Sequence, residues 1–182
     1  SIFLTADRLF AGLDTRPDEN LALYDRMAGG APVTLVAGIG APEQMSVMGA
    51  KVGTFEQWMQ VYTTHVLAPE RQIDPIVDAL KHGHSYVAFD FLKYVPVFAF
   101  FAQRGARKAL MGDEIAMGSG LKLRVEMPSP ADKVVIYRNG EAVASAQSVS
   151  TFEFAPQAPG AYRMEAYLRG CPWIYSNPVY LR

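Results

Sequence analysis

The stretch KVVIYRNGEAVA, residues 133–144, decides the fold of the second part of this chain. It places two runs of strand-forming residues on either side of Asn139-Gly140. Asn and Gly both tolerate the positive φ that a two-residue type I′ turn requires. The stretch therefore predicts a β-hairpin, and the surrounding sequence extends the β pattern in both directions.

Alternation of apolar and polar residues continues on both sides of this hairpin. Residues 121–127 and 160–168 alternate as half-buried strands do, and residues 151–154 and 179–181 supply further short strands. Tyr162 follows a Pro-Gly turn and resembles the tyrosine corner of immunoglobulin-like folds. About five to seven strands joined by short turns predict a small antiparallel immunoglobulin-like β-sandwich.

The first part of the chain carries mixed helix and strand signals. Asp18 can cap a helix whose apolar residues Leu21, Tyr24 and Ala28 are spaced three to four apart, and two glycines end it. Residues 33–37 then form a short apolar run that is typical of a strand buried on both faces. A helix followed by such a strand is half of an α/β unit.

The same alternation of element types continues further along the first part. Residues 55–62 suggest a helix, and Asp74 and the following Pro predict the start of another helix that closes at Gly83. Residues 85–91 and 95–101 are apolar strand candidates. These signals predict an α+β chain, with a partial α/β segment at residues 1–112 and the β-sandwich module at residues 113–182.

Composition narrows the classes of function. The 182 residues include 17 Lys and Arg against 18 Asp and Glu, so the net charge of −1 gives no electrostatic footprint for nucleic acid. No apolar run approaches the roughly 18 residues of a membrane span, and the charged N-terminal residues argue against a signal peptide. We therefore expect a soluble protein of undecided compartment, and the lack of an initiator Met favours a piece of a longer protein.

Histidines and carboxylates supply weak candidates for chemistry. His82 and His84 resemble the H-x-H pair of many metal sites, although histidine at a helix C-terminus is also favoured by the macrodipole. His65 could line a pocket or satisfy neighbouring hydroxyls. Asp90 ends an apolar run, where burial would raise its pKa for acid–base work, or it could simply accept hydrogen bonds from loop amides.

Aromatic residues near the C-terminus suggest a different class of function. Trp173 and Tyr175 could stack on a sugar or a peptide, although their default role is in the core. A carbohydrate- or protein-binding β-sandwich is therefore an alternative to an enzyme.

Several stretches in this order resemble the C-terminal half of PHP-type (polymerase and histidinol phosphatase) metal-dependent phosphoesterases, in particular the carbaryl-hydrolase-like branch with its β-rich tail. The stretches that carry the resemblance are residues 3–8, 52–55, 64–68, 79–90, 111–113 and 172–180.

The resemblance implies a fold, a cofactor and a missing part. Such enzymes use a distorted β/α barrel with two or three divalent metals, zinc or manganese, and their early ligands would lie upstream of Ser1. The last family ligands come from an Asp-Ala-His, and the matching place here is Gly40-Ala41-Pro42. Gly and Pro offer no donor side chain, so the chain is expected to hold no catalytic metal and to lack catalysis by itself.

Three functions follow from these observations. The first is a non-catalytic C-terminal portion of a PHP-like hydrolase, and the second is the binding module. The third is an active hydrolase with an unusual site built from His65, His82, His84 and Asp90. A partial barrel would leave residues 95–101 uncovered, so we expect either repacking, a homo-oligomer or association with the missing N-terminal half.

Overall fold

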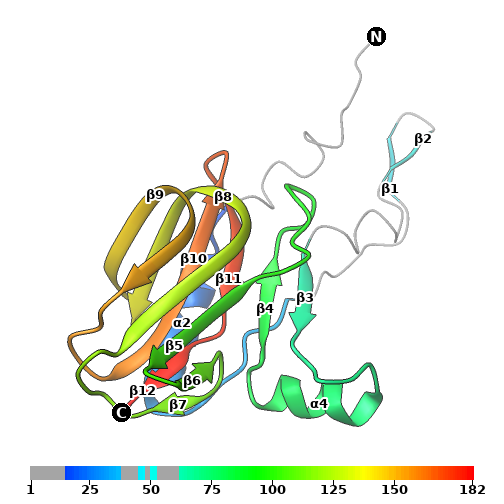
Figure 1. Cartoon of the computed structure of the whole chain (residues 1–182). Coiled ribbons are helices and arrows are strands. Elements are labelled where there is room, and N and C mark those ends of the chain that lie inside the picture. The colour runs from blue at the N-terminus through cyan, green and yellow to red at the C-terminus, as the bar shows by residue number, and fades with distance from the viewer. Residues whose placement is uncertain (1–14, 38–44, 48–49, 53–61) are drawn as a thin grey trace.

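The computed structural model describes residues 15–37, 45–47, 50–52 and 62–182. Strands dominate these residues (Figure 1). The elements in chain order are α2 (Asp18–Gly30), β1 (Met45–Val47), β2 (Ala50–Val52), β3 (Thr63–Val66), α4 (Ile73–Lys81), β4 (Ser85–Ala88), β5 (Ala99–Arg104), β6 (Arg107–Leu110), β7 (Glu114–Ile115), β8 (Lys122–Arg138), β9 (Glu141–Phe154), β10 (Gly160–Leu168), β11 (Cys171–Ser176) and β12 (Val179–Leu181).

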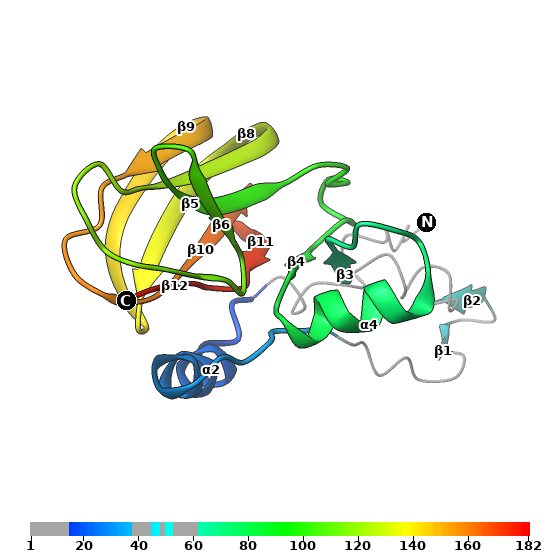
Figure 2. The ribbon, with the colours of Figure 1, turned by 60° about the horizontal axis from the view of Figure 1, so that its bottom comes forward.

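Ten strands form one curled sheet (Figure 2). Its main order is β3-β4-β11-β10-β8-β5-β6, while β9 pairs with β8 and β12 pairs with β10. These pairings are antiparallel, and β12 and β7 form a parallel pair. Strands from before and after residue 112 therefore belong to one sheet. The predicted domain boundary there stays a prediction.

The long strand β8 makes the sheet curl. Its first half pairs with β5, its second half pairs with β10, and the register with β9 shifts between Glu126 and Ala131. A register shift of this kind bends a strand and increases its twist. The two halves of β8 consequently carry their neighbours to opposite sides of one apolar core.

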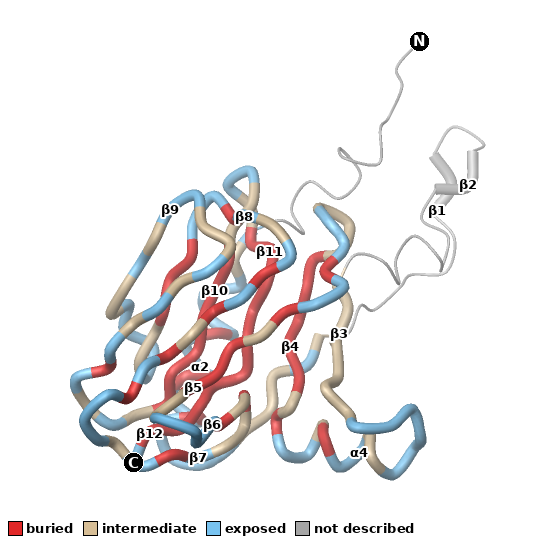
Figure 3. The backbone as a smooth tube through the Cα atoms, viewed as in Figure 1, coloured by how far each residue is buried: buried red, intermediate tan, exposed pale blue. Residues whose placement is uncertain are grey.

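That core is built from inward residues of both halves of the sheet. Its largest buried side chains include Phe100, Leu123, Ile136, Met164 and Trp173. Figure 3 shows β4 buried along its length, whereas β3 at the edge of the sheet is only half-buried.

The hairpin and the tyrosine contact agree with the sequence. Asn139 and Gly140 have φ values of 50° and 89° and join β8 to β9, so the predicted hairpin is confirmed. The hydroxyl of Tyr162 donates a hydrogen bond to the carbonyl oxygen of Ala158 at 2.6 Å. A tyrosine corner makes the same kind of bond to backbone a few residues upstream.

The expected partial α/β barrel is wrong. β4 is buried on both faces, as a strand of a parallel sheet would be, but it pairs antiparallel with β3 and β11. Hydrophobic runs report burial and not strand direction, so the curled antiparallel sheet produces the same sequence signal. The fold is β-rich and compatible with a β-sandwich.

Two apolar runs also differ from expectation. Residues 33–37 form no strand, because side chains satisfy their backbone: Asn177 bonds to both backbone groups of Leu35, and Thr64 bonds to both of Ala37. Residues 95–101 are largely covered, although Val97 is 70% exposed. The core takes up this run within the same chain.

A close backbone crossing joins the α4–β4 turn to the turn before β7. Gly83 and Gly112 have φ values of 75° and 91°. A Cβ atom on Gly112 would lie 1.7 Å from the carbonyl oxygen of His82. The N–H of Gly112 also donates a hydrogen bond to the carbonyl of Pro178 at 2.6 Å. Only a residue without a side chain fits at this crossing.

Candidate functional site

His65 and Asp90 form a hydrogen-bonded pair beside the antiparallel strands β3 and β4. His65 lies opposite Tyr86 in the ladder, and Asp90 lies in the turn that follows β4. Nε2 of His65 is 2.8 Å from Oδ2 of Asp90. The other carboxylate oxygen of Asp90 accepts the N–H of Val95 at 3.0 Å. The turn therefore fixes the carboxylate, and the carboxylate fixes the imidazole.

Aromatic rings complete the surroundings of His65. Its imidazole stacks on Tyr86, with ring centroids 4.7 Å apart and planes at 4°. The ring of Tyr94, which is 67% exposed, lies 6.4 Å away. Burial raises the pKa of Tyr86 well above its usual range, and the charge of Asp90 adds to this effect. Tyr86 is therefore a protonated packing surface and not a base.

This pair can accept a proton through one nitrogen. A carboxylate only accepts hydrogen bonds, so Nε2 of His65 donates and Nδ1 keeps its lone pair. The neighbouring hydroxyl of Thr64 is already bonded to the backbone of Ala37. The arrangement resembles the base and orienting group of a nucleophilic site.

His82 and His84 lie elsewhere, at the C-terminal end of α4. Nδ1 of His82 bonds to the carbonyl oxygen of Asp78 at 2.9 Å, and Nε2 of His84 bonds to Oδ1 of Asp113 at 3.0 Å. Across the described ranges, three or more His, Cys, Asp or Glu residues nowhere gather as a metal site of several protein ligands requires. The structure pairs His65 with Asp90 and His82 with His84, and it does not unite all four.

The two aromatic residues that were considered for stacking on a ligand are in the core. Trp173 is completely buried, and its Nε1 donates a hydrogen bond to the carbonyl of Lys93 at 2.7 Å. Tyr175 is 5% exposed. The default role in the core is therefore confirmed for these two residues, and neither is placed to stack on a sugar or a peptide.

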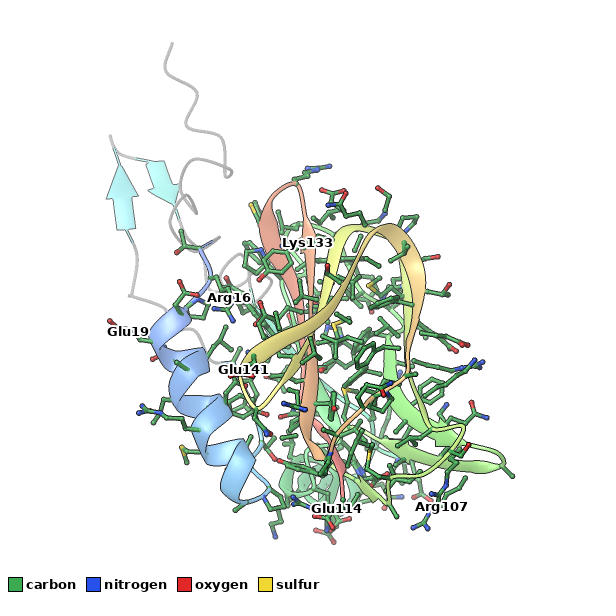
Figure 4. All side chains as sticks on the ribbon, turned by 90° about the vertical axis from the view of Figure 1, so that its left-hand side faces the viewer. Arg16, Glu19, Arg107, Glu114, Lys133 and Glu141 are labelled. Carbon is green, nitrogen blue, oxygen red and sulfur yellow. The ribbon has the colours of Figure 1, made fainter. Side chains whose placement is uncertain are left out.

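A buried ionic network under α2 is a feature that the sequence analysis missed. Arg163 binds Asp25 through two hydrogen bonds of 2.5 and 2.7 Å, and it binds Glu165 at 2.6 Å. Arg16 adds two bonds to Glu165, and Tyr167 donates a third. Figure 4 shows Arg16 on the side of α2 that faces the sheet. The network ties α2 to the outer face of β10.

Charge and burial compete at Glu165. Burial alone would raise the pKa of this carboxyl, but the hydrogen bonds from Arg16 and Tyr167 and the charge of Arg163 outweigh it and hold the pKa below its ordinary value. Asp25 follows Leu21 by about one helical turn and therefore lies on the buried face of α2. A carboxylate on this face was the sequence signal for a buried ionic partner.

Asn177 is a second buried polar residue that the sequence did not single out. Its Oδ1 accepts the hydroxyl of Tyr24 at 2.7 Å and the N–H of Leu35 at 2.6 Å. Its Nδ2 donates to the carbonyl and the hydroxyl of Ser85 at 2.8 and 3.0 Å. One side chain thus joins α2, the irregular segment after it and β4.

Several predictions fall on residues outside the described ranges. They include the expected helix at residues 55–61 and the Gly40-Ala41-Pro42 stretch. Within the described ranges, neither helix has the length and hydropathy that crossing a bilayer requires.

Comparisons with known proteins add little to this geometry. No protein-family model and no curated protein matches the chain. Among solved structures, a lytic polysaccharide monooxygenase of Jonesia denitrificans, determined by neutron crystallography, is similar at 11% identity with a TM-score of 0.28. The match covers 38% of this chain and 57% of that one, so it spans little more than half of that protein.

Proposed function

We propose that the chain is the carboxy-terminal portion of a PHP-like metal-dependent hydrolase. In this proposal it supplies a β-rich module and one wall of the substrate site, and it is not catalytic by itself. The ordered sequence resemblance supports the family. The residues at the family's last ligand place do not fit its metals, because Gly40 and Pro42 carry no donor side chain. We therefore assign no metal-dependent step to this chain.

The His65–Asp90 pair is the observation that carries the proposal. An imidazole held by a carboxylate, with one nitrogen unused, is the acid–base half of a hydrolytic site. The side chain of His65 remains 18% exposed at the edge of the sheet, where a further polypeptide can reach it. In the complete enzyme, this pair would receive or deliver a proton while other residues activate the attacking water.

The isolated chain provides the first test. Incubated with Mn²⁺ or Zn²⁺, it is expected to hydrolyse bis(p-nitrophenyl) phosphate no faster than the metal salt alone. Turnover above that rate that is lost in His65→Gln would contradict the non-catalytic role and favour the active hydrolase.

The complete reading frame provides the second test. It is expected to encode an upstream segment with an H-x-H pair, and its product is expected to hydrolyse phosphoesters or related esters. There His65→Gln should lower kcat/KM by roughly a hundredfold, the lower end of what general acid–base groups contribute. Lys122→Gln, on an exposed stretch of β8, is the matched control. A frame without such a segment would refute the proposal.

A further inference from the structure

We propose that His82 and His84 form a surface site for one divalent transition cation, such as Zn²⁺ or Ni²⁺. This site is separate from the His65–Asp90 pair and does not depend on the proposed hydrolase role. His82, Gly83 and His84 are the three residues between the end of α4 at Lys81 and the start of β4 at Ser85.

Hydrogen bonding determines which nitrogen each histidine offers. A backbone carbonyl can only accept, so Nδ1 of His82 donates to Asp78 and Nε2 of His82 keeps a lone pair. The carboxylate of Asp113 likewise accepts a hydrogen bond from Nε2–H of His84, which leaves Nδ1 with a lone pair. Histidines that bind metals in proteins show this pattern, with the second ring nitrogen donating to a carbonyl or a carboxylate.

The distance between the rings suits a shared cation. The centroids of His82 and His84 are 5.9 Å apart, and their planes are tilted by 34°. A cation about 2.1 Å from one nitrogen of each ring allows centroids up to roughly 6.5 Å apart. The spacing of the two rings is therefore within the range that a shared cation allows.

The backbone between the two histidines is held in place. Gly83 has a φ of 75°, and a Cβ there would meet the Cα of Gly112 at 3.3 Å. Asp113, the partner of His84, is itself fixed by the N–H of Leu110 at 2.8 Å. A fixed backbone reduces the entropy that is lost when a cation orders both side chains.

The site would be open and exchangeable. The side chain of His82 is 62% exposed, and that of His84 is 27% exposed. Because the described residues bring no third ligand to the pair, water would fill the remaining coordination positions. We therefore expect reversible binding, unlike the closed four-ligand sites that stabilise zinc domains.

Nuclear magnetic resonance of the histidine rings tests the proposal on the full chain. The chain has three histidines, so its imidazole spectrum contains three resolvable groups. On titration with Zn²⁺ at neutral pH, the signals of His82 and His84 are expected to shift together and to saturate at one cation per chain. The signals of His65 are expected to stay in place, although its ring also bonds to a carboxylate.

Variants make the test decisive. His82→Ala removes an exposed side chain and is expected to weaken Zn²⁺ binding by roughly tenfold or more, whereas His65→Gln should leave the affinity within about twofold. Thermal melts confirm that both variants fold. The proposal is overturned if Zn²⁺ causes no saturable shift, if the His65 signals shift most, or if His82→Ala binds as the unaltered chain does.

Discussion

Replacing Gly112 by Ala should destabilise the protein far more than the same replacement at Gly120. Both glycines have a positive φ, 91° and 76°, so an Ala at either position carries a similar backbone strain of about 1–2 kcal/mol. At Gly120 a Cβ would meet nothing within 4 Å. At Gly112 it would lie 1.7 Å from the carbonyl oxygen of His82, and real Cβ contacts are essentially never under 3.0 Å.

The crossing must therefore open by about 1.3 Å to admit the methyl group. Shifts of packed backbone on this scale cost about 1–3 kcal/mol. The expected loss in the free energy of unfolding is about 2–5 kcal/mol for Gly112→Ala, against about 1–2 kcal/mol for Gly120→Ala. The first loss is a large part of the stability of an ordinary domain.

Urea denaturation measured by tryptophan fluorescence and circular dichroism provides the comparison. Both variants should keep the m-value of the unaltered chain, since a changed m-value would indicate a change in the state being unfolded. Equal losses at the two positions would refute the reasoning. They would mean that His82 and Gly112 do not approach each other as described.

Three further changes test the polar contacts under α2. Arg163→Met should lower the free energy of unfolding by about 3–5 kcal/mol, because it removes the guanidinium that binds the buried carboxylate of Asp25 and one of the partners of Glu165. A loss no larger than that of the exposed Lys122→Met would contradict this. Acid should loosen the packing of α2 on the sheet. The folded-state pKa of Glu165 is lowered, so the stability that this carboxylate contributes is present above about pH 4.5 and is lost as the pH falls through the folded-state pKa. Faster hydrogen exchange of the α2 amides at low pH would measure this loss. Asn177→Leu should cost about 2–4 kcal/mol in thermal unfolding, because several buried partners lose their bonds, and a loss below about 1 kcal/mol would show that water replaces the amide.

Local signals predicted the elements that local chemistry determines. The Asn139-Gly140 turn and the strand Gly160–Leu168 appear where the sequence placed them, and the predicted helix spans Asp18–Gly30 with Pro17, not Asp18, as its N-cap. In each case the apolar residues that set the periodicity and the residues that begin or end the element are close together in the sequence. Such elements need little information from the rest of the chain.

Elements whose identity depends on distant partners were not predictable in the same way. Residues 33–37 have the apolar composition of a buried strand, yet distant side chains bond to their backbone: Asn177, more than 140 positions away, to Leu35, and Thr64 to Ala37. The outer face of β10 was expected to face solvent, and Asp25 from α2 covers Arg163 there. The pattern of apolar residues within each segment does not indicate these distant partners.

The error in fold class also explains why the candidate pair could not be placed from the sequence. In an α/β arrangement, consecutive strands run parallel, so the end of one strand lies far from the start of its neighbour. In the antiparallel pair of β3 and β4, which α4 connects, Thr63 pairs with Ala88, and the turn after β4 returns beside the beginning of β3. That direction brings Asp90 to His65. The residue types could be chosen from the sequence, but their pairing required the direction of the strands.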